Sequence, residues 1–189
     1  MIRSTAAVLL FTFVFAIIAC SDRATKLPVY GVVPPFELTD SLGRPFDSGQ
    51  LTGKVWIADF IYTHCPGPCP RMTSQMHSVQ KKLKDDSDTR LVSFTVDPDR
   101  DNPTVLNAFA QRFGGPADDW FFLTGSRDTL HHLARNVFMV GDLIGVMDHS
   151  TKFILVDQKR QIRGFYSTFD AEGILTLLRD VDALRRSRG

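Results

Sequence analysis

The 189-residue sequence has no marked excess of charge of either sign. Its 22 lysines and arginines are balanced by 21 aspartates and glutamates, and the formal net charge is +1. The chain therefore lacks the basic surplus that is typical of nucleic-acid-binding proteins. Internal repeats and low-complexity tracts are also absent after residue 21. The length and the 43% hydrophobic content indicate one globular domain with a full core.

No apolar run is long enough to cross a membrane as a helix. The run at residues 6–19 has 14 residues, whereas a membrane-spanning helix needs about 20. It follows Arg3 and ends in IIAC, which is typical of a signal peptide that ends in the lipidation motif of bacterial lipoproteins. Cys20 would then carry lipid and become the new N-terminus. An uncleaved anchor with a chance cysteine is the alternative, and both predict an exported chain.

These features divide the chain into three parts. We predict a lipoprotein signal peptide over residues 1–20, a tether over 21–32, and a single domain over 33–189.

Cysteine is scarce, with three residues in the whole chain. If Cys20 carries lipid, only Cys65 and Cys69 remain in the mature domain. They lie four positions apart in the stretch YTHCPGPCP, residues 62–70. A disulfide between them would close a very small loop and stabilise the fold little, which disfavours a purely structural role. A redox couple and a pair of thiolate metal ligands both stay open.

The order of the predicted elements indicates an α/β fold. Residues 54–63 form a nearly continuous apolar run, which is typical of a buried strand, and Pro70 suits the first turn of the next helix. The other patterns predict a hairpin over 32–51, strands over 90–97 and 119–125, helices over 101–114, 127–138 and 170–187, and two strands over 152–167. A buried strand that feeds a helix, repeated, predicts a central mixed sheet flanked by helices. The order matches a thioredoxin-like (peroxiredoxin-like) fold with an N-terminal β-hairpin extension.

In that fold, Cys65 and Cys69 lie between the first core strand and its helix. A helix N-terminus presents unpaired N–H groups and a partial positive charge, which stabilise a thiolate. Thiolate is both the nucleophile and the metal ligand, so position alone does not separate the two roles. The spacing C-x-x-x-C, instead of the C-x-x-C of thioredoxins, favours chelation of a soft ion.

His149 is the predicted third ligand. It lies in the polar segment VMDHST, before the strand KFILV, and the loop entering that strand faces the cysteine helix in a thioredoxin-like fold. Two thiolates and one imidazole suit copper, as Cu(I) or Cu(II), better than zinc, which normally takes a fourth ligand. Asp148 is placed to orient His149. His64 either contacts the metal or raises the local positive charge beside Cys65.

Three separated motifs resemble the SCO/SenC family of copper chaperones. The motifs are DFIYTHCPGPCPRMT (59–73), SFTVDPDRDNP (93–103) and DHSTKFILVDQKRQIRGFY (148–166). The resemblance implies a thioredoxin-like domain that is anchored to a bacterial cell membrane and faces the periplasm. It also implies that Cys65, Cys69 and His149 bind one copper ion per chain.

The same resemblance implies partners. The expected client is the dinuclear copper site of cytochrome c oxidase subunit II, to which the protein delivers copper or whose cysteines it reduces. Another copper chaperone or a thiol reductant would supply copper or electrons, and a lipid anchor would hold the chain at the membrane. Two departures from the family are expected: a lipid anchor in place of a transmembrane helix, and His64 before the first cysteine.

Two other functions compete with the chaperone. A thiol–disulfide oxidoreductase would use Cys65 and Cys69 as a redox disulfide, with His149 as an acid or base or as a bystander. A peroxidase of the peroxiredoxin type is disfavoured because Tyr62 stands where those enzymes place threonine or serine. We therefore expect a metallochaperone rather than an enzyme, and we assign no catalytic residue.

Overall fold

The computed structural model describes residues 27–83, 88–140 and 151–187. Its strands are β1 (Gly31–Val32), β2 (Glu37–Asp40), β3 (Pro45–Asp47), β4 (Val55–Ile61), β5 (Thr89–Thr95), β6 (Trp120–Thr124), β7 (Lys152–Val156) and β8 (Gln161–Ser167). Its helices are α2 (Pro68–Leu83), α3 (Pro103–Gln111), α4 (Arg127–His132) and α5 (Ala171–Arg186), with the short segments η2 (Ser48–Leu51) and η3 (Leu133–Val137). Cys20, Asp148 and His149 lie outside the described residues.

The strands form a mixed eight-stranded sheet in the order β1-β8-β7-β4-β5-β6-β2-β3. Strands β4, β5 and β6 are parallel, while β7, β8 and β2 run antiparallel to their neighbours. All seven residues of β4 are buried, as its continuous apolar sequence predicts for a central parallel strand. The predicted thioredoxin-like α/β fold is confirmed.

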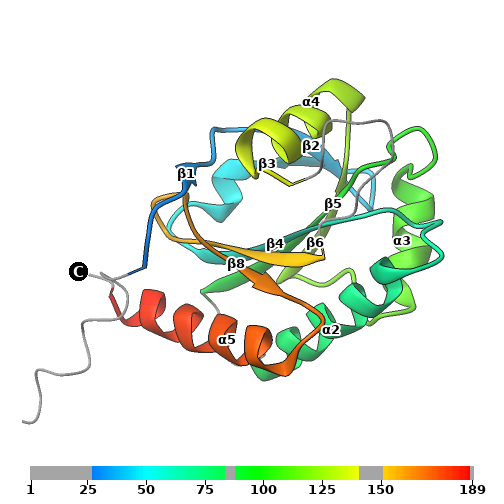
Figure 1. Ribbon diagram of the computed structural model, residues 1–189. Helices are drawn as coiled ribbons and strands as arrows, with labels where there is room; N and C mark the ends of the chain where they lie inside the picture. The colour runs from blue at the N-terminus through cyan, green and yellow to red at the C-terminus, as the bar shows by residue number, and fades with distance from the viewer. Residues whose placement is uncertain (1–26, 84–87, 141–150, 188–189) are drawn as a thin grey trace, which may run out of the picture.

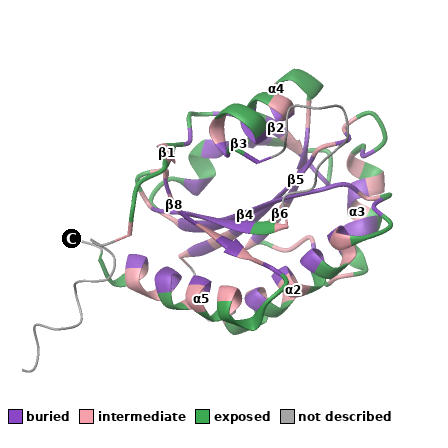
Figure 2. Cartoon of the chain, in the orientation of Figure 1, coloured by how far each residue is buried: buried purple, intermediate pink, exposed green. Residues whose placement is uncertain are grey.

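Helices cover both faces of the sheet (Figure 1). Because β4, β5 and β6 follow one another in one direction, right-handed crossovers place α2 and α3 on the same face. Helix α5 packs on that face too, since residues of α2, α3 and α5 share one core cluster. The opposite face is covered by α4 and η3, which contribute to a second cluster. Figure 2 shows the buried residues of the sheet between these two layers.

Residues of β4 alternate between the two faces, as the period of a strand requires. Val55, Ile57 and Ile61 belong to the cluster under α2, whereas Trp56 and Phe60 belong to the cluster under α4. Asp59 therefore lies on the α2 face, the same face as the cysteines that follow β4.

Helix α2 begins at Pro68, two residues before the predicted start at Pro70. Pro68 suits this first position because its fixed φ is helical and no N–H is lost from the helix. As a result Cys69 lies inside the first turn of α2, and Cys65 lies in the loop before it.

The chain joins the sheet earlier than the predicted boundary at residue 33. Strand β1, inside the range assigned to the tether, pairs with β8 through Gly31 and Ile162. The Arg163 guanidinium donates to the carbonyl oxygens of Leu27 at 2.7 Å and of Pro28 at 3.1 Å. A strand of two residues has too little periodicity to be recognised in a sequence.

The helix predicted over 127–138 is interrupted. It begins after Ser126, whose hydroxyl accepts from the Thr129 N–H at 3.1 Å, as capping chemistry predicts. It changes to π-helical geometry over η3. The hairpin expected over 32–51 is present as β2 and β3, and Asn102 caps α3, the helix expected over 101–114.

Candidate functional site

The two cysteines are buried residues of the loop and the first helical turn that follow β4. Cys65 is 6% exposed and Cys69 is fully buried, and both are free thiols. The Cys69 N–H points to Cys65 Sγ at 3.4 Å, so the first turn of α2 directs a backbone donor at the loop sulfur. The Cys65 N–H donates to the Tyr62 carbonyl at 3.3 Å and closes the turn between them. The structure thus brings the two predicted sulfur ligands together.

The surroundings of the two thiols make them unequal. Burial opposes ionisation of Cys65, but hydrogen bonds from the N–H groups of Cys69 and Gly67 and from the Cys69 and Tyr62 side chains outweigh it, and the pKa is lowered. Burial raises the pKa of Cys69, and the neighbouring Cys65 and Asp59 charges raise it further. Cys65 is therefore the more readily ionised thiol of the pair and Cys69 the less readily ionised one.

Tyr62 caps the sulfur pair from the strand side. Burial, its hydrogen bond to Cys65 and the negative charges of Cys65, Cys69 and Asp97 raise the pKa of Tyr62 to about 12. The phenol stays protonated and donates to Cys65, which stabilises the thiolate form of that cysteine.

Asp59 is a carboxyl group that the sequence reasoning missed. It is fully buried on the α2 face, and neither oxygen has a hydrogen-bond partner among the described residues. Burial raises the pKa of Asp59 to about 7, and the nearby Ser93 hydroxyl opposes this but lies outside bonding geometry. An aspartate inside a continuous apolar strand was the available signal, because such a residue is seldom buried without a reason.

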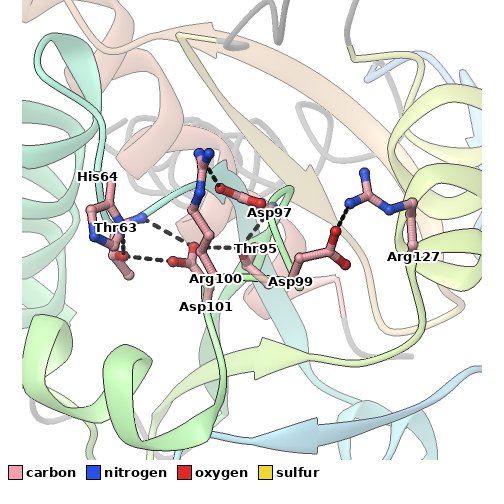
Figure 3. A network of polar contacts seen from close by, with 8 residues as sticks. All are labelled: Thr63, His64, Thr95, Asp97, Asp99, Arg100, Asp101 and Arg127. Atoms are coloured by element: carbon pink, nitrogen blue, oxygen red, sulfur yellow. Dashed lines mark hydrogen bonds and ion pairs between the residues drawn. The ribbon is translucent and has the colours of Figure 1, made fainter.

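A second buried carboxylate, Asp101, ties the cysteine loop to the neighbouring strand (Figure 3). Its Oδ2 accepts from the Thr63 N–H at 3.0 Å and from the Thr95 hydroxyl at 2.6 Å. Its Oδ1 accepts from the Thr63 hydroxyl at 2.5 Å. These bonds join residue 63, between β4 and Cys65, to the end of β5.

The segment DPDRD, residues 97–101, folds around this carboxylate. The Asp97 N–H donates to the Thr95 hydroxyl at 3.0 Å, and the Asp101 N–H donates to the Asp97 carbonyl at 2.9 Å. Asp99 forms an ion pair with Arg127 at the start of α4. The bonds from Thr63 to Asp101 mean that this segment shapes the loop beside the cysteines.

The histidines are distributed as follows. His64 is exposed, and its Nδ1 lies 3.0 Å from the Thr63 hydroxyl (Figure 3). His131 and His132 lie on α4, half-buried and exposed respectively, on the face of the sheet opposite α2. His149 and Asp148 fall within residues 141–150, so their place beside the cysteines stays a prediction.

Over residues 27–83, 88–140 and 151–187, no three histidine, cysteine or acidic side chains gather in an arrangement that could hold a metal ion. The described part of the site therefore supplies two sulfur donors. Two thiol sulfurs at a helix N-terminus fit a soft ion such as Cu(I). In the same residues, no helix combines the length and the hydropathy needed to span a membrane.

The protein is a thioredoxin-like domain that carries an unequal pair of cysteines at the start of its first long helix. The SCO1/SenC family model matches residues 25–182. The chain belongs to the SCO1/SenC family.

Known relatives agree with this membership. The SCO1 protein homolog of Bacillus subtilis is 41% identical over 125 residues, which cover 66% of this chain and 63% of that protein. A SCO1/SenC family lipoprotein from Bacillus anthracis has a solved structure with a TM-score of 0.77 and 34% identity, covering 85% of this chain and 98% of that one.

Two further solved structures are informative. BsSco, described as a member of the Sco family of cytochrome c oxidase assembly proteins with a disulfide switch, gives a TM-score of 0.73 at 32% identity over 83% of this chain and 95% of that one. ScoI of Arabidopsis thaliana, solved with copper bound, gives a TM-score of 0.66 at 25% identity over 82% of this chain and 99% of that one.

Proposed function

We propose that this chain is a copper chaperone that carries one copper ion on Cys65, Cys69 and His149. The observation that carries the proposal is the unequal pair of buried sulfurs at the N-terminus of α2, with a lowered pKa at Cys65. Copper would be cargo, and its ligands must release it to a partner. The copper-bound relative supports this choice of metal.

A competition titration with a chromophoric Cu(I) chelator tests the copper site. The reduced protein should take up one equivalent of copper, and Cys65→Ser or Cys69→Ser should abolish tight uptake because each removes a thiolate ligand. Oxidation of the two thiols to a disulfide should abolish it as well. Stoichiometric copper retained after complete oxidation would refute thiolate ligation.

His149→Ala tests the third ligand. We expect the copper affinity to fall by orders of magnitude while Cys65 and Cys69 still form a disulfide, because the imidazole is needed for the metal and not for the sulfur–sulfur bond. An unchanged affinity in the competition titration would remove His149 from the site.

The proposed client is the dinuclear copper site of cytochrome c oxidase subunit II. The similar structure of BsSco, which is described as a member of the Sco family of cytochrome c oxidase assembly proteins, supports this client. Deletion of the gene should lower cytochrome c oxidase activity in the native host, and added copper should restore it if delivery of copper is the role. Restoration by a thiol reductant instead of copper would assign the protein to reduction of the client cysteines.

The proposed location is the periplasmic side of a bacterial cell membrane, with a lipid on Cys20. The IIAC motif supports it, and the Bacillus anthracis relative is described as a lipoprotein. Labelled fatty acid should be incorporated into the wild-type chain and not into Cys20→Ser, and the wild-type chain should fractionate with membranes. Unlabelled wild-type protein would leave the uncleaved anchor as the explanation.

A thiol–disulfide oxidoreductase is the second candidate, and one observation favours it. Cys65 has a lowered pKa and Cys69 a raised one, which is the division between an attacking thiolate and a resolving thiol. Disulfide formation between Cys65 and Cys69 would survive His149→Ala, whereas tight copper binding would not, so the same variant separates the two functions.

A further inference from the structure

The edge strand β1 and the residue pair before it expose three large apolar side chains. Val29, Tyr30 and Val32 are 52%, 52% and 56% exposed. The Tyr30 ring packs edge-on against Phe165 of β8, with 5.2 Å between the ring centroids, and the Tyr30 N–H donates to a carbonyl of β8 at 2.9 Å. The segment is therefore held on the sheet while its apolar side chains stay uncovered.

Two other segments of the chain lie beside this apolar segment. The Val33 N–H donates to the Arg160 carbonyl at 2.8 Å, which places the turn between β7 and β8 next to the end of β1. The Gln158 side chain donates to the Leu184 carbonyl at 2.8 Å, which joins the same turn to the last turn of α5. We call these three segments, residues 27–33, 157–163 and 182–187, the basic corner.

The basic corner carries more positive than negative charge. Its acidic residues are two, Asp157, which is buried and pairs with Arg163 at 2.7 Å, and Asp182, which lies 3.4 Å from Arg185. Its basic residues are more numerous: Lys159, Arg160, Arg163, Arg185 and Arg186. The surplus of cations around exposed apolar side chains is complementary to an anionic surface with an apolar interior, which is the chemistry of a lipid bilayer.

The proposed lipid on Cys20 restricts which side of the domain can meet the membrane. Seven residue steps separate Cys20 from Leu27, and a fully extended chain of that length reaches about 25 Å at most. The Leu27 carbonyl accepts from Arg163 at 2.7 Å, inside the basic corner. A membrane that holds the lipid therefore lies within about 25 Å of this corner.

The basic corner lies at the end of the sheet opposite the cysteines. Helix α2, with Cys69 in its first turn, follows the C-terminal end of β4. Strand β7 runs antiparallel to β4, so the turn after β7 lies at the N-terminal end of β4. Figure 1 shows the chain that enters β1 and the end of α5 at this same end of the molecule, on the left. A domain that rests on this corner turns its cysteines away from the membrane.

We propose that the basic corner, with its exposed Val29, Tyr30 and Val32, docks on a membrane surface that contains anionic lipid and holds the cysteine loop facing away from the bilayer. Aromatic rings settle at the level of the headgroups, and lysine and arginine are attracted to anionic lipid. A lipid chain and a basic surface are also two signals that together hold a protein at a membrane. The inference rests on the proposed lipid on Cys20.

Quenching of tryptophan fluorescence by brominated lipid tests the docked surface. The lipidated full chain is reconstituted in vesicles of phosphatidylcholine, with or without bromine on its acyl chains, and anionic phosphatidylglycerol. The indole of Tyr30→Trp should be quenched by the brominated lipid. Phe169→Trp is the matched control, because residue 169 is 43% exposed and follows β8 at the cysteine end, and its indole should not be quenched. Trp56 and Trp120 are buried and supply a constant background.

Two outcomes would overturn the proposal. Equal quenching of Tyr30→Trp and Phe169→Trp would show that the domain takes no preferred orientation on the vesicle. An unquenched indole in Tyr30→Trp would show that these apolar residues do not contact lipid, and would assign them to a protein partner instead.

The charges are tested in the Tyr30→Trp background. Each cation near an anionic membrane contributes about a fivefold factor to the docked population, so Lys159→Gln with Arg186→Gln should lower the ratio of docked to undocked molecules by about 25-fold. Arg100→Gln with Arg127→Gln removes the same charge at the cysteine end of the sheet and should leave the quenching unchanged. Equal quenching in the two double variants would refute the contact between the basic corner and anionic lipid.

The lipid anchor and the docked surface fail differently. Mass spectrometry that finds no lipid on Cys20 of the wild-type chain would refute the anchor and, with it, this docking. A chain that carries the lipid, but whose Tyr30→Trp indole is not quenched, would refute the docked surface alone.

Discussion

Asp59 places a carboxyl group in the core, next to Cys69, with no hydrogen-bond partner among the described residues. Its pKa rises from 3.8 to about 7 on folding, so the folded state holds the proton over a range in which the unfolded chain has released it. The unfolded state then binds fewer protons, and the free energy of unfolding falls as pH rises between about 4 and 7.

Asp59→Asn should remove this part of the pH dependence. The cost in the wild-type protein reaches roughly 4 kcal/mol above about pH 7, at 1.36 kcal/mol for each pKa unit. Urea unfolding of the reduced, copper-free proteins across this range should therefore show a smaller decline for Asp59→Asn than for the wild type. Asp128→Asn, which changes an exposed carboxyl, is the control and should keep the wild-type decline. Parallel curves for Asp59→Asn and the wild type would contradict the prediction.

The two thiols should differ in reactivity. Iodoacetamide reacts with the thiolate, so Cys65, with its lowered pKa, should be alkylated first and Cys69 more than about tenfold more slowly. Mass spectrometry of the reduced protein locates the first adduct, and Cys65→Ser reports the rate of Cys69 alone. Equal labelling of the two positions would show that the asymmetry is absent.

Among single residues, the sequence identified those whose signal lies within a few positions along the chain. Cys65 and Cys69 were recognised from their spacing, and they lie together. The roles of Asp59 and Asp101 depend on contacts across strands, since Asp101 bonds to Thr63, 38 positions away, and such partners do not show in a local pattern. The placement of His149 stays a prediction.

Among the elements, β1 is attached to the sheet by backbone hydrogen bonds and by one side chain. The Tyr30 N–H donates to the Ile162 carbonyl at 2.9 Å, and the Val33 N–H donates to the Arg160 carbonyl at 2.8 Å. Arg163 pairs with Asp157 at 2.7 Å, with side chains only 11% and 4% exposed, and also donates to the carbonyls of Leu27 and Pro28. Because a strand of two residues makes few bonds of its own, this guanidinium adds to the attachment of the N-terminal segment.

Arg163→Met should release this segment and destabilise the fold. Breaking a buried ion pair costs about 3 to 5 kcal/mol because the remaining charge stays buried. Urea unfolding measures the loss, and hydrogen exchange at residues 30–33 should become faster. Arg186→Met, at a position 68% exposed, is the matched control and should change stability by less than about 0.5 kcal/mol. Unaltered exchange at residues 30–33 would show that β1 holds without Arg163.

Elements with strong local patterns were predictable, and short or irregular ones were not. The apolar run of β4 was recognised because its signal lies within a few residues, and the helices that Asn102 and Ser126 cap were recognised from equally local patterns. The start of α2 was placed two residues late because Pro68 and Pro70 both suit a first helical turn. The π-helical η3 follows α4 without a sequence signal that distinguishes it from a regular helix.

For the whole molecule, copper binding should raise thermal stability. A ligand that binds only the folded state at a free concentration of about 1,000 times Kd adds roughly 4 kcal/mol, which is about 8 to 16 °C in Tm for a domain of this size. Scanning calorimetry of the reduced protein with buffered Cu(I) should show this rise. The double variant Cys65→Ser, Cys69→Ser should show none, and an equal rise in that variant would place the copper elsewhere.

The overall architecture was predictable because the alternation of buried strands and helices leaves few ways to arrange the chain. Strands β4, β5 and β6, linked by α2 and α3, form the parallel centre that this alternation requires. The exact strand order, with β2 beside β6 and β1 beside β8, depends on pairings between distant segments. Those pairings are decided by packing at the sheet edges rather than by any local pattern.

The two edges of the sheet have a consequence for behaviour at high concentration. The edge strands β1 and β3 have two and three residues, and β3 begins with Pro45, which has no N–H to donate. Such short edges offer little template for pairing with a strand of another molecule. Copies of this protein crowded on one surface would therefore resist growing into extended β-aggregates, even though the sheet that each contains is eight strands wide.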